Sequence, residues 1–192
     1  MEDLQLLDFQ VKSIFKNYDV TFIEDISIIL REKTLKSDIF IIDKNLEKKY
    51  SFLWSDLDLD QNLIFLNANE SQKSYQGLKV IIERLIQIGF RKNHRLIGIG
   101  GGIIQDITAF ISSIMYRGVK WIFIPTTLLA QGDSCIGSKT SINFDKFKNQ
   151  LGGFYPPDQI YISLKFLETL PQIDIKSGIG EMCHYFIIDG KK

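Results

Sequence analysis

Three consecutive glycines, Gly100 to Gly102, are the feature of this sequence most suggestive of chemistry. They follow the apolar run Leu96-Ile97-Gly98-Ile99 and precede a helical pattern of apolar residues. Glycines at a strand-to-helix turn let an anion reach bare backbone N–H groups at the helix N-terminus. The pattern therefore predicts a pyrophosphate site, and its alternative interpretation is a tight structural turn.

Polar residues also follow the other apolar runs. Asp43 ends the run 38–43, residues 67–70 follow the run 63–66, and Pro125-Thr126-Thr127 follow the run 121–124. In open α/β sheets, ligands bind beyond the carboxyl ends of the strands. We therefore expect these residues to converge on one ligand.

The alternation of short apolar runs with amphipathic helical patterns predicts the fold class. We expect an α/β protein with a Rossmann-like open sheet and helices on both faces, followed by the start of an all-α domain. Predicted domains are a nucleotide-binding α/β unit over 1–160 and the beginning of a truncated helical unit over 161–192. A hairpin turn is expected at 16–19, loop or weak helix at 44–62, a polar loop across 133–149, and another loop at 151–157. Helices are expected near 78–86 and 173–188.

Composition limits the function classes. The 192 residues are 45% apolar, and 23 basic side chains balance 23 acidic ones, so we expect no nucleic-acid or anionic-membrane partner. Two distant cysteines, Cys135 and Cys183, favour a reducing compartment over a disulfide scaffold. The N-terminal segment has no secretory pattern, and no apolar run approaches the roughly 20 residues of a spanning helix. These features predict a cytoplasmic protein.

Several motifs together resemble those of the 3-dehydroquinate synthase family and the wider sugar-phosphate cyclases. They are GGGIIQD, MYRG, PTTLLAQGDS, GSKTSIN, KNQLGGFYPP, FLETLP and KSGIGEM, in the family's order. The resemblance implies a homodimeric carbon-oxygen lyase with NAD and a divalent metal, zinc or cobalt. Its substrate would be a seven-carbon sugar-acid phosphate, which is oxidised, loses phosphate, is reduced again and closes by an aldol step to 3-dehydroquinate.

The resemblance also assigns cofactor contacts. They are Asp43, Glu70, Lys73, Gly101, Gly102, Ile103, Asp106, Thr126, Thr127, Leu129, Asp133, Lys139, Lys148, Phe166 and Thr169. A carboxylate after a strand can accept hydrogen bonds from ribose hydroxyls, and Asp106 is expected on the first turn of a helix, where the dipole favours it. If the resemblance is set aside, the residues alone favour a helix-start carboxylate for Asp106. For Glu70 and Lys73 they favour a solvated first turn of a helix.

The resemblance places Arg117, Asp133, Lys139, Lys148 and Asn149 on the catalytic, substrate side. Arginine and lysine suit a carboxylate and a leaving phosphate, although a surface role is the default for each. Asp133 can alternatively be a capping or turn residue. Glu181 matches the first metal ligand of the family, while His94 is expected to be a solvated loop residue.

Three positions depart from the family pattern. Gln105 and Ser138 stand where the family usually has glycine, and His184 replaces a lysine that follows the metal-binding glutamate. Glu181 and His184 share a helical face at i, i+3, so both can reach a metal, or His184 is a hydrogen-bonding or core residue. The alternatives to a synthase are a paralogue making another cyclitol, a glycerol dehydrogenase-like enzyme, and an isolated nucleotide-binding module. We expect the 192-residue chain alone to be inactive.

Overall fold

The computed structural model describes residues 7–55, 57 and 60–189. Its strands are β1 (Phe9–Val11), β2 (Tyr18–Phe22), β3 (Ile39–Asp43), β4 (Leu63–Leu66), β5 (Arg95–Gly100), β6 (Lys120–Pro125), β7 (Lys139–Phe144), β8 (Phe147–Phe154) and β9 (Gln159–Ile162). Its helices are α1 (Ile26–Lys33), α2 (Asn45–Lys49), α3 (Ser51–Ser55), α4 (Tyr75–Gln87), α5 (Gly102–Ile114), α6 (Lys165–Glu168) and α7 (Gln172–Asp189). Short turns are η2 (Asp60–Asn62), η3 (Met115–Arg117) and the π-helical η4 (Ala130–Ser134).

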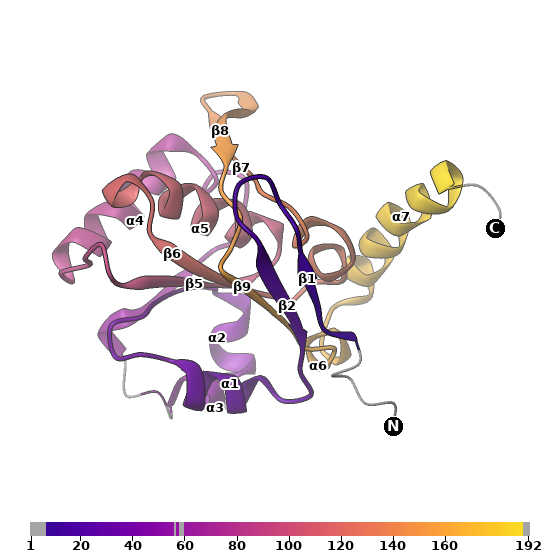
Figure 1. Cartoon of the computed structure of the whole chain (residues 1–192), viewed down its shortest axis with the longest axis horizontal. Coiled ribbons are helices and arrows are strands. Elements are labelled where there is room, and N and C mark those ends of the chain that lie inside the picture. The colour runs from indigo at the N-terminus through magenta and orange to yellow at the C-terminus, as the bar shows by residue number, and fades with distance from the viewer. Residues whose placement is uncertain (1–6, 56, 58–59, 190–192) are drawn as a thin grey trace.

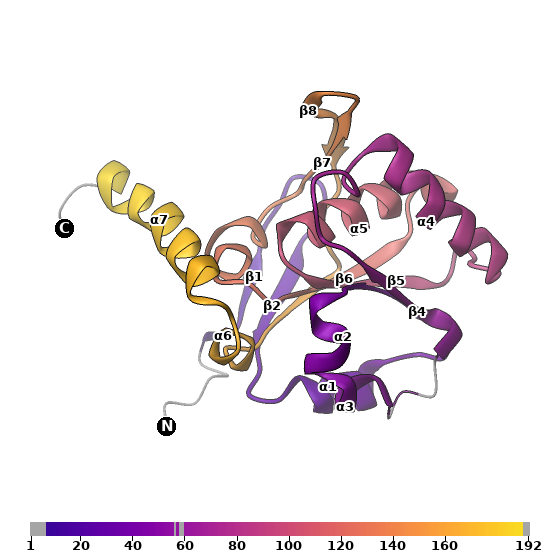
Figure 2. The same cartoon turned by 180° about the vertical axis from the view of Figure 1, so that it is seen from behind.

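The predicted α/β sheet is confirmed. Seven strands pair in the order β1-β2-β9-β6-β5-β3-β4, all parallel except β1, which is antiparallel to β2. Helices α4 and α5 cover one face, and α1, α2 and α3 cover the other (Figures 1 and 2). No helix in the described ranges is long and apolar enough to cross a membrane.

Alternation along the central strands divides the core into two layers. On β3, Ile39 and Ile41 join the cluster under α4 and α5, while Phe40 and Ile42 join the cluster over α1 to α3. Successive side chains of a strand point to opposite faces, so a continuous apolar run is the pattern of a strand covered on both sides. The run 38–43 therefore specifies a central strand, and β3 pairs with β4 and β5.

The segment 139–154 differs from the loops expected there. It forms the antiparallel pair β7 and β8, which projects from the top of the molecule in Figure 1. A Cβ on Gly152 would lie 2.0 Å from the carbonyl oxygen of Thr140, so this glycine permits close strand pairing. Glycine in a strand can mark such an approach as well as a loop, which explains the wrong prediction.

Other differences concern the edges of the fold. The sequence reading missed α1, whose N-cap Asp25 accepts a hydrogen bond from Ser27 N at 2.9 Å. The expected turn at 16–19 is shorter, because Tyr18 and Asp19 belong to β2. β4 is half-buried, since it is an edge strand.

The helix expected over 173–188 is confirmed by α7, which extends away from the sheet. Its base packs on η4 with little space between the backbones. A Cβ on Gly178 would lie 2.8 Å from Leu128 Cβ, and one on Gly132 would lie 3.2 Å from Met182 Sδ. The proposed domain boundary after residue 160 remains a prediction, and β9 runs across it.

Gly98 lies where α5 packs closely against β5, so a substitution there tests whether this close packing is required. A Cβ there would meet Thr108 Oγ1 at 2.7 Å and Thr108 Cβ at 3.1 Å. We expect Gly98→Ala to lower the free energy of unfolding by about 1–3 kcal/mol in urea titrations, because overpacking forces β5 and α5 apart.

Adding Thr108→Ala should recover part of this loss. Thr108 Oγ1 has no hydrogen-bond partner among the described residues, so its removal breaks no such bond. Wild-type stability in Gly98→Ala alone would contradict the packing argument.

Candidate functional site

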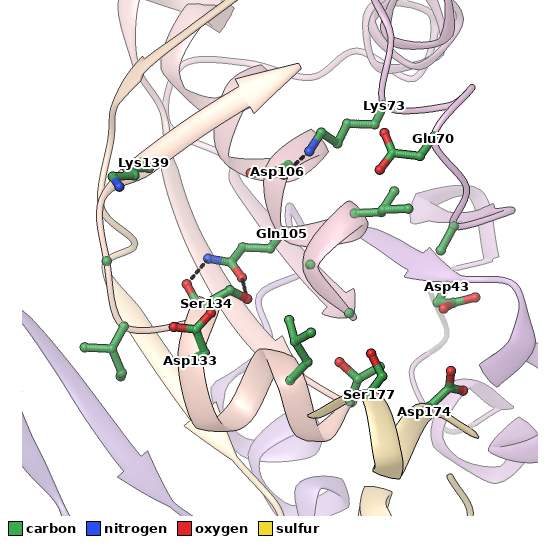
Figure 3. A pocket seen from close by; sticks show the side chains of 18 of the residues that line it. Asp43, Glu70, Lys73, Gln105, Asp106, Asp133, Ser134, Lys139, Asp174 and Ser177 are labelled. Carbon is green, nitrogen blue, oxygen red and sulfur yellow. Dashed lines mark hydrogen bonds and ion pairs between the residues drawn. The ribbon is translucent and has the colours of Figure 1, made fainter. Parts of the chain in front are cut away.

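A cleft of about 1050 Å³ opens at the carboxyl ends of β3, β5 and β6. The chain passes from β3 to the edge strand β4 and then crosses back to β5 on the other side of β3. Such a switch in strand order leaves a crevice where α/β proteins bind ligands. The lining residues are Asp43, Asn45, Ala68, Glu70, Lys73, Gly101, Gly102, Ile103, Gln105, Asp106, Thr127, Leu129, Asp133, Ser134, Ile136, Gly137, Ser138, Lys139, Phe154, Asp174 and Ser177 (Figure 3).

The three glycines have different surroundings. A Cβ on Gly100 would lie 2.5 Å from Ile104 Cγ1, and one on Gly101 would lie 3.0 Å from Thr127 Cγ2. By contrast, the nearest atom to a Cβ on Gly102 would be Ser134 Oγ at 3.8 Å, an ordinary contact. Gly100 is therefore required by packing, whereas Gly102 leaves open space toward the cleft.

The N-terminus of α5 fits an anionic group. Gly101 is the N-cap and makes no side-chain capping bond, and the backbone hydrogen bond of Gln105 N to Gly101 O begins the helix. The first N–H groups of a helix lack intrahelical acceptors and carry the positive end of its dipole. The cleft therefore offers what a pyrophosphate needs, which is bare backbone donors without a side chain above them.

Gly102→Ala separates a binding role from a structural one. We expect the free energy of unfolding to stay within about 0.5 kcal/mol of wild type, because the added methyl group meets no close neighbour. The affinity for NAD should fall at least severalfold, because the methyl group occupies the space above the helix N-terminus. The contrasting variant Gly100→Ala should instead lose stability in the same urea titration. Unchanged NAD affinity in Gly102→Ala would remove Gly102 from the site.

Lys73 and Asp106 form a shielded ion pair beside the cleft. Lys73 Nζ lies 2.7 Å from Asp106 Oδ2, and their side chains are only 9% and 24% exposed. Burial raises the pKa of Asp106, and the hydrogen bond from Lys73 opposes that rise. Because α5 begins at Gly102, Asp106 lies on the second turn and not on the first, so the expected dipole argument was wrong. Lys73 is likewise buried and not on a solvated turn.

Asp43 brings a desolvated carboxylate to the floor of the cleft. Burial is the main cause that raises the pKa of Asp43, and the charge of Asp174 on α7 raises it further, while a hydrogen bond from Asn45 N lowers it. Figure 3 shows Asp43, Asp174 and Ser177 at the same end of the cleft. Such acceptors suit a ligand that presents hydroxyl groups.

Because the pKa of Asp43 is raised, we predict that Asp43→Asn increases the melting temperature by an amount that depends on pH. Above the pKa of Asp43 the wild-type fold must hold a desolvated charge, so the variant should melt at a higher temperature at neutral pH. The advantage should shrink as the pH falls through that pKa, because wild-type Asp43 is then neutral as well. Melting temperatures across a pH series test this expectation, with the exposed Glu83→Gln as the control. A difference that does not vary with pH would contradict it.

The η4 turn is held from two sides. Gln105 Nε2 donates to the carbonyl oxygen of Ser134 at 2.6 Å, and Ser134 Oγ donates to Gln105 Oε1 at 2.7 Å (Figure 3). From α7, the Tyr185 hydroxyl donates to the Asp133 carboxylate, and this bond is the main cause that raises the pKa of Tyr185. Cys135, next to this turn, is buried, and its pKa is raised to about 12, so it is no thiolate nucleophile.

Most of the predicted cofactor residues line the cleft, but four do not, namely Thr126, Phe166, Thr169 and Lys148. Thr126 is buried and donates its N–H to Gly100 O at 3.0 Å. Phe166 packs edge-on against Tyr50 with ring centroids 5.1 Å apart, and the Thr169 hydroxyl lies 2.6 Å from the Tyr50 hydroxyl. Phe166 and Tyr50 belong to the core layer that packs against α1 to α3.

The predicted substrate residues divide in the same way. Asp133 and Lys139 line the cleft, whereas Lys148 and Asn149 lie on β8, with Lys148 Nζ 3.8 Å from Glu70 Oε1. Arg117 follows the far end of α5, which as a 13-residue helix puts it about 20 Å from the glycines. Its backbone and that of Tyr116 are left-handed, with φ of 62° and 51°.

The predicted metal ligand Glu181 is exposed on α7. Within the described ranges, no group of three His, Cys, Asp or Glu side chains could hold a metal ion. The described residues therefore do not form a complete metal site by themselves. His94, expected to be solvated, is half-buried and lies edge-on to Phe90 with ring centroids 5.7 Å apart.

Sequence reasoning missed several cleft residues, including Asn45, Phe154, Asp174 and Ser177. Asp174 and Ser177 are spaced i, i+3 and so share a helical face, a signal that was available. Which face of α7 meets the cleft depends on its packing against η4, and the sequence alone does not show that contact.

Comparison with known proteins gives the relationship. A family model described as 3-dehydroquinate synthase N-terminal matches residues 63–177, more than half of the chain. The chain belongs to the 3-dehydroquinate synthase family. A family member from Streptococcus equi subsp. equi (strain 4047), itself called 3-dehydroquinate synthase, is 36% identical over 189 residues, covering 95% of this chain and 52% of the relative.

Solved structures share the fold. A 2-deoxy-scyllo-inosose synthase superposes with a TM-score of 0.78 at 21% identity, covering 90% of this chain and 51% of that one. The 2-epi-5-epi-valiolone synthase from Streptomyces hygroscopicus subsp. jinggangensis 5008, with NAD⁺ and Zn²⁺ bound, gives 0.76 at 26% identity, covering 90% and 50%. This member of the 3-dehydroquinate synthase family thus spans about half the length of these relatives.

Proposed function

We propose that this chain forms the NAD-binding part of a 3-dehydroquinate synthase. The observation that carries the proposal is the cleft at the switch in strand order, where Gly102 leaves the N-terminus of α5 open. Membership of the 3-dehydroquinate synthase family and the NAD⁺ and Zn²⁺ bound to the valiolone synthase relative support it. The proposed protein acts in the cytoplasm on a small sugar-acid phosphate, without a nucleic-acid or membrane partner.

The cleft residues would share the binding of NAD. Backbone N–H groups at the start of α5 would receive the pyrophosphate, and the carboxylates of Asp43 and Glu70 would accept hydrogen bonds from ribose hydroxyls. The Lys73–Asp106 pair lies beside this path and keeps a buried carboxylate neutralised. When bound, NAD would supply reversible hydride acceptance at the substrate carbon.

The substrate side would depend on Asp133 and Lys139. Lys139 is exposed at the start of β7 and offers a compact positive charge to the phosphate or carboxylate of the substrate. The carboxylate of Asp133 lies toward the cleft and accepts a hydrogen bond from the Tyr185 hydroxyl. Glu181 would provide one ligand of a divalent ion, whose chemistry is to polarise the hydroxyl being oxidised. We propose that the 192 residues alone are inactive, because the described part supplies one metal carboxylate.

Arg117 requires a second copy of the chain. The helix α5 separates it from the cleft of its own chain by about 20 Å. In the proposed homodimer, two-fold symmetry can bring Arg117 of one copy to the cleft of the other. Arg117 is exposed, and its left-handed backbone follows Tyr116, whose hydroxyl donates to Phe90 O at 2.8 Å.

The function is tested on the protein that carries this chain at its natural length. With NAD and Zn²⁺, the seven-carbon sugar-acid phosphate should release phosphate and yield 3-dehydroquinate by NMR, without net NADH. Turnover of a neutral seven-carbon sugar phosphate alone would assign it to another cyclitol, for which the departure at His184 provides a reason. Bulk release of NADH from an alcohol would indicate a dehydrogenase.

Mixed dimers test the place of Arg117. Arg117→Ala and Lys139→Ala should each abolish phosphate release while leaving NAD binding largely intact. Dissociating and mixing the two inactive proteins in equal amounts should restore about one quarter of wild-type activity, because half the dimers are mixed and each then has one complete site. No recovery in verified mixed dimers would place Arg117 in its own chain's site.

A further inference from the structure

Asn143 is a buried amide that touches both walls of the cleft region. It lies on β7 and is only 6% exposed. Its backbone N donates to Lys73 O at 2.8 Å, and its side-chain Nδ2 donates to Glu70 Oε2 at 2.6 Å. Its Oδ1 accepts from Asn149 N at 2.9 Å. One residue therefore contacts Glu70 and Lys73 before α4 and Asn149 on β8.

The local backbone explains how Asn143 reaches these partners. The register between β7 and β8 shifts between Ile142 and Phe144, so Asn143 lies at an irregularity of the ladder. Such irregularities turn a side chain away from regular pairing and often occur next to active sites. An isolated parallel bridge joins Asn143 to Ser74, so the hairpin is anchored to the segment that precedes α4.

The two partners of the amide need opposite hydrogen-bonding groups. Glu70 presents a carboxylate and needs a donor, while the N–H of Asn149 needs an acceptor. Asn149 has a left-handed backbone with φ of 56°, a conformation that asparagine tolerates and that this bond helps to hold. A buried asparagine satisfies both partners at once, whereas an ionised aspartate of the same size satisfies one of them and leucine satisfies neither.

We propose that Asn143 is a positioning residue that joins the β7–β8 hairpin to the cofactor cleft. On one side it holds Oε2 of Glu70, which leaves Oε1 for a ligand hydroxyl and near Lys148 Nζ at 3.8 Å. On the other side it fixes the backbone that presents Lys148 and Asn149. This inference rests on the proposed NAD-binding function, and it adds a residue that makes no cofactor contact itself.

The decisive variant is Asn143→Asp in the natural-length protein. It keeps an acceptor for Asn149 N–H but replaces the donor to Glu70 with a second carboxylate. At neutral pH the like charges should release the hairpin, and NAD should bind about tenfold more weakly. As the pH falls, the two carboxylates can share one proton, so NAD affinity should move back toward that of wild type at the same pH.

A double-variant cycle makes the test independent of pH. In the Glu70→Gln background, the amide at position 70 can donate to the carboxylate that Asn143→Asp introduces. Asn143→Asp should therefore lower NAD affinity only slightly in the Glu70→Gln background and strongly when Glu70 is present. The matched control is Gln87→Glu, which adds the same charge at an exposed position at the end of α4 and should leave NAD affinity near wild type. Equal effects of Asn143→Asp in both backgrounds would overturn the proposal.

Hydrogen exchange of residues 139–154 without ligand separates this proposal from the proposed function. Faster exchange in Asn143→Asp than in Gln87→Glu at neutral pH supports the positioning role, even if wild type binds no NAD and the proposed function fails. Unchanged exchange together with unchanged NAD affinity overturns the role of Asn143 while leaving NAD binding intact.

Discussion

The close approach of α5 to β5 sets the geometry of this protein, because the cleft is formed where that helix begins. Gly98 and Gly100 lie on the strand side of this contact, against Thr108 and Ile104 of the helix. With side chains at these positions, the helix would be displaced from the sheet. The backbone donors at its N-terminus would then no longer lie level with the ends of β3 and β6.

The cleft itself is held open at a cost in stability. Its floor carries the desolvated carboxylates of Asp43 and Asp106, and Asp106 is the one of the two that accepts a hydrogen bond from a lysine. The charge of Asp43 is therefore destabilising where it is buried, whereas the ion pair with Lys73 offsets the same cost for Asp106. The apolar layers above and below the sheet supply the stability that makes such a site tolerable.

Two elements that leave the sheet complete the cleft walls. Strand β7 places Ile142 in the apolar core and is joined by Asn143 to the segment before α4, so the hairpin is anchored to the rest of the fold. Helix α7 meets η4 and the turn before η4 at the close glycine contacts of Gly178 and Gly132. Lys139 therefore begins a strand that is fixed in the core, whereas Glu181 is exposed on a helix that extends away from the sheet.

The sequence alone determined the layered sheet and the position of the glycine turn between β5 and α5. Both depend on local patterns, namely the apolar runs of β3, β5 and β6 and the glycines that follow β5. The family motifs added the residue assignments, most of which line one cleft, and their roles stay predictions. Local patterns also predicted the helices α4, α5 and α7 correctly.

Only the tertiary structure decided which glycines allow close packing of α5 on the sheet and which border the cleft. Gly100 and Gly102 look alike in sequence, yet a Cβ on one would clash with Ile104, whereas the other borders the cleft and would make only an ordinary contact with Ser134. The same reason explains why Gly152 signalled a loop but lies in a strand, and why Asp106 pairs with Lys73 instead of capping a helix. In each case the neighbour that decides the outcome is supplied by the packing of the elements, so the residues beside it in the sequence do not reveal it.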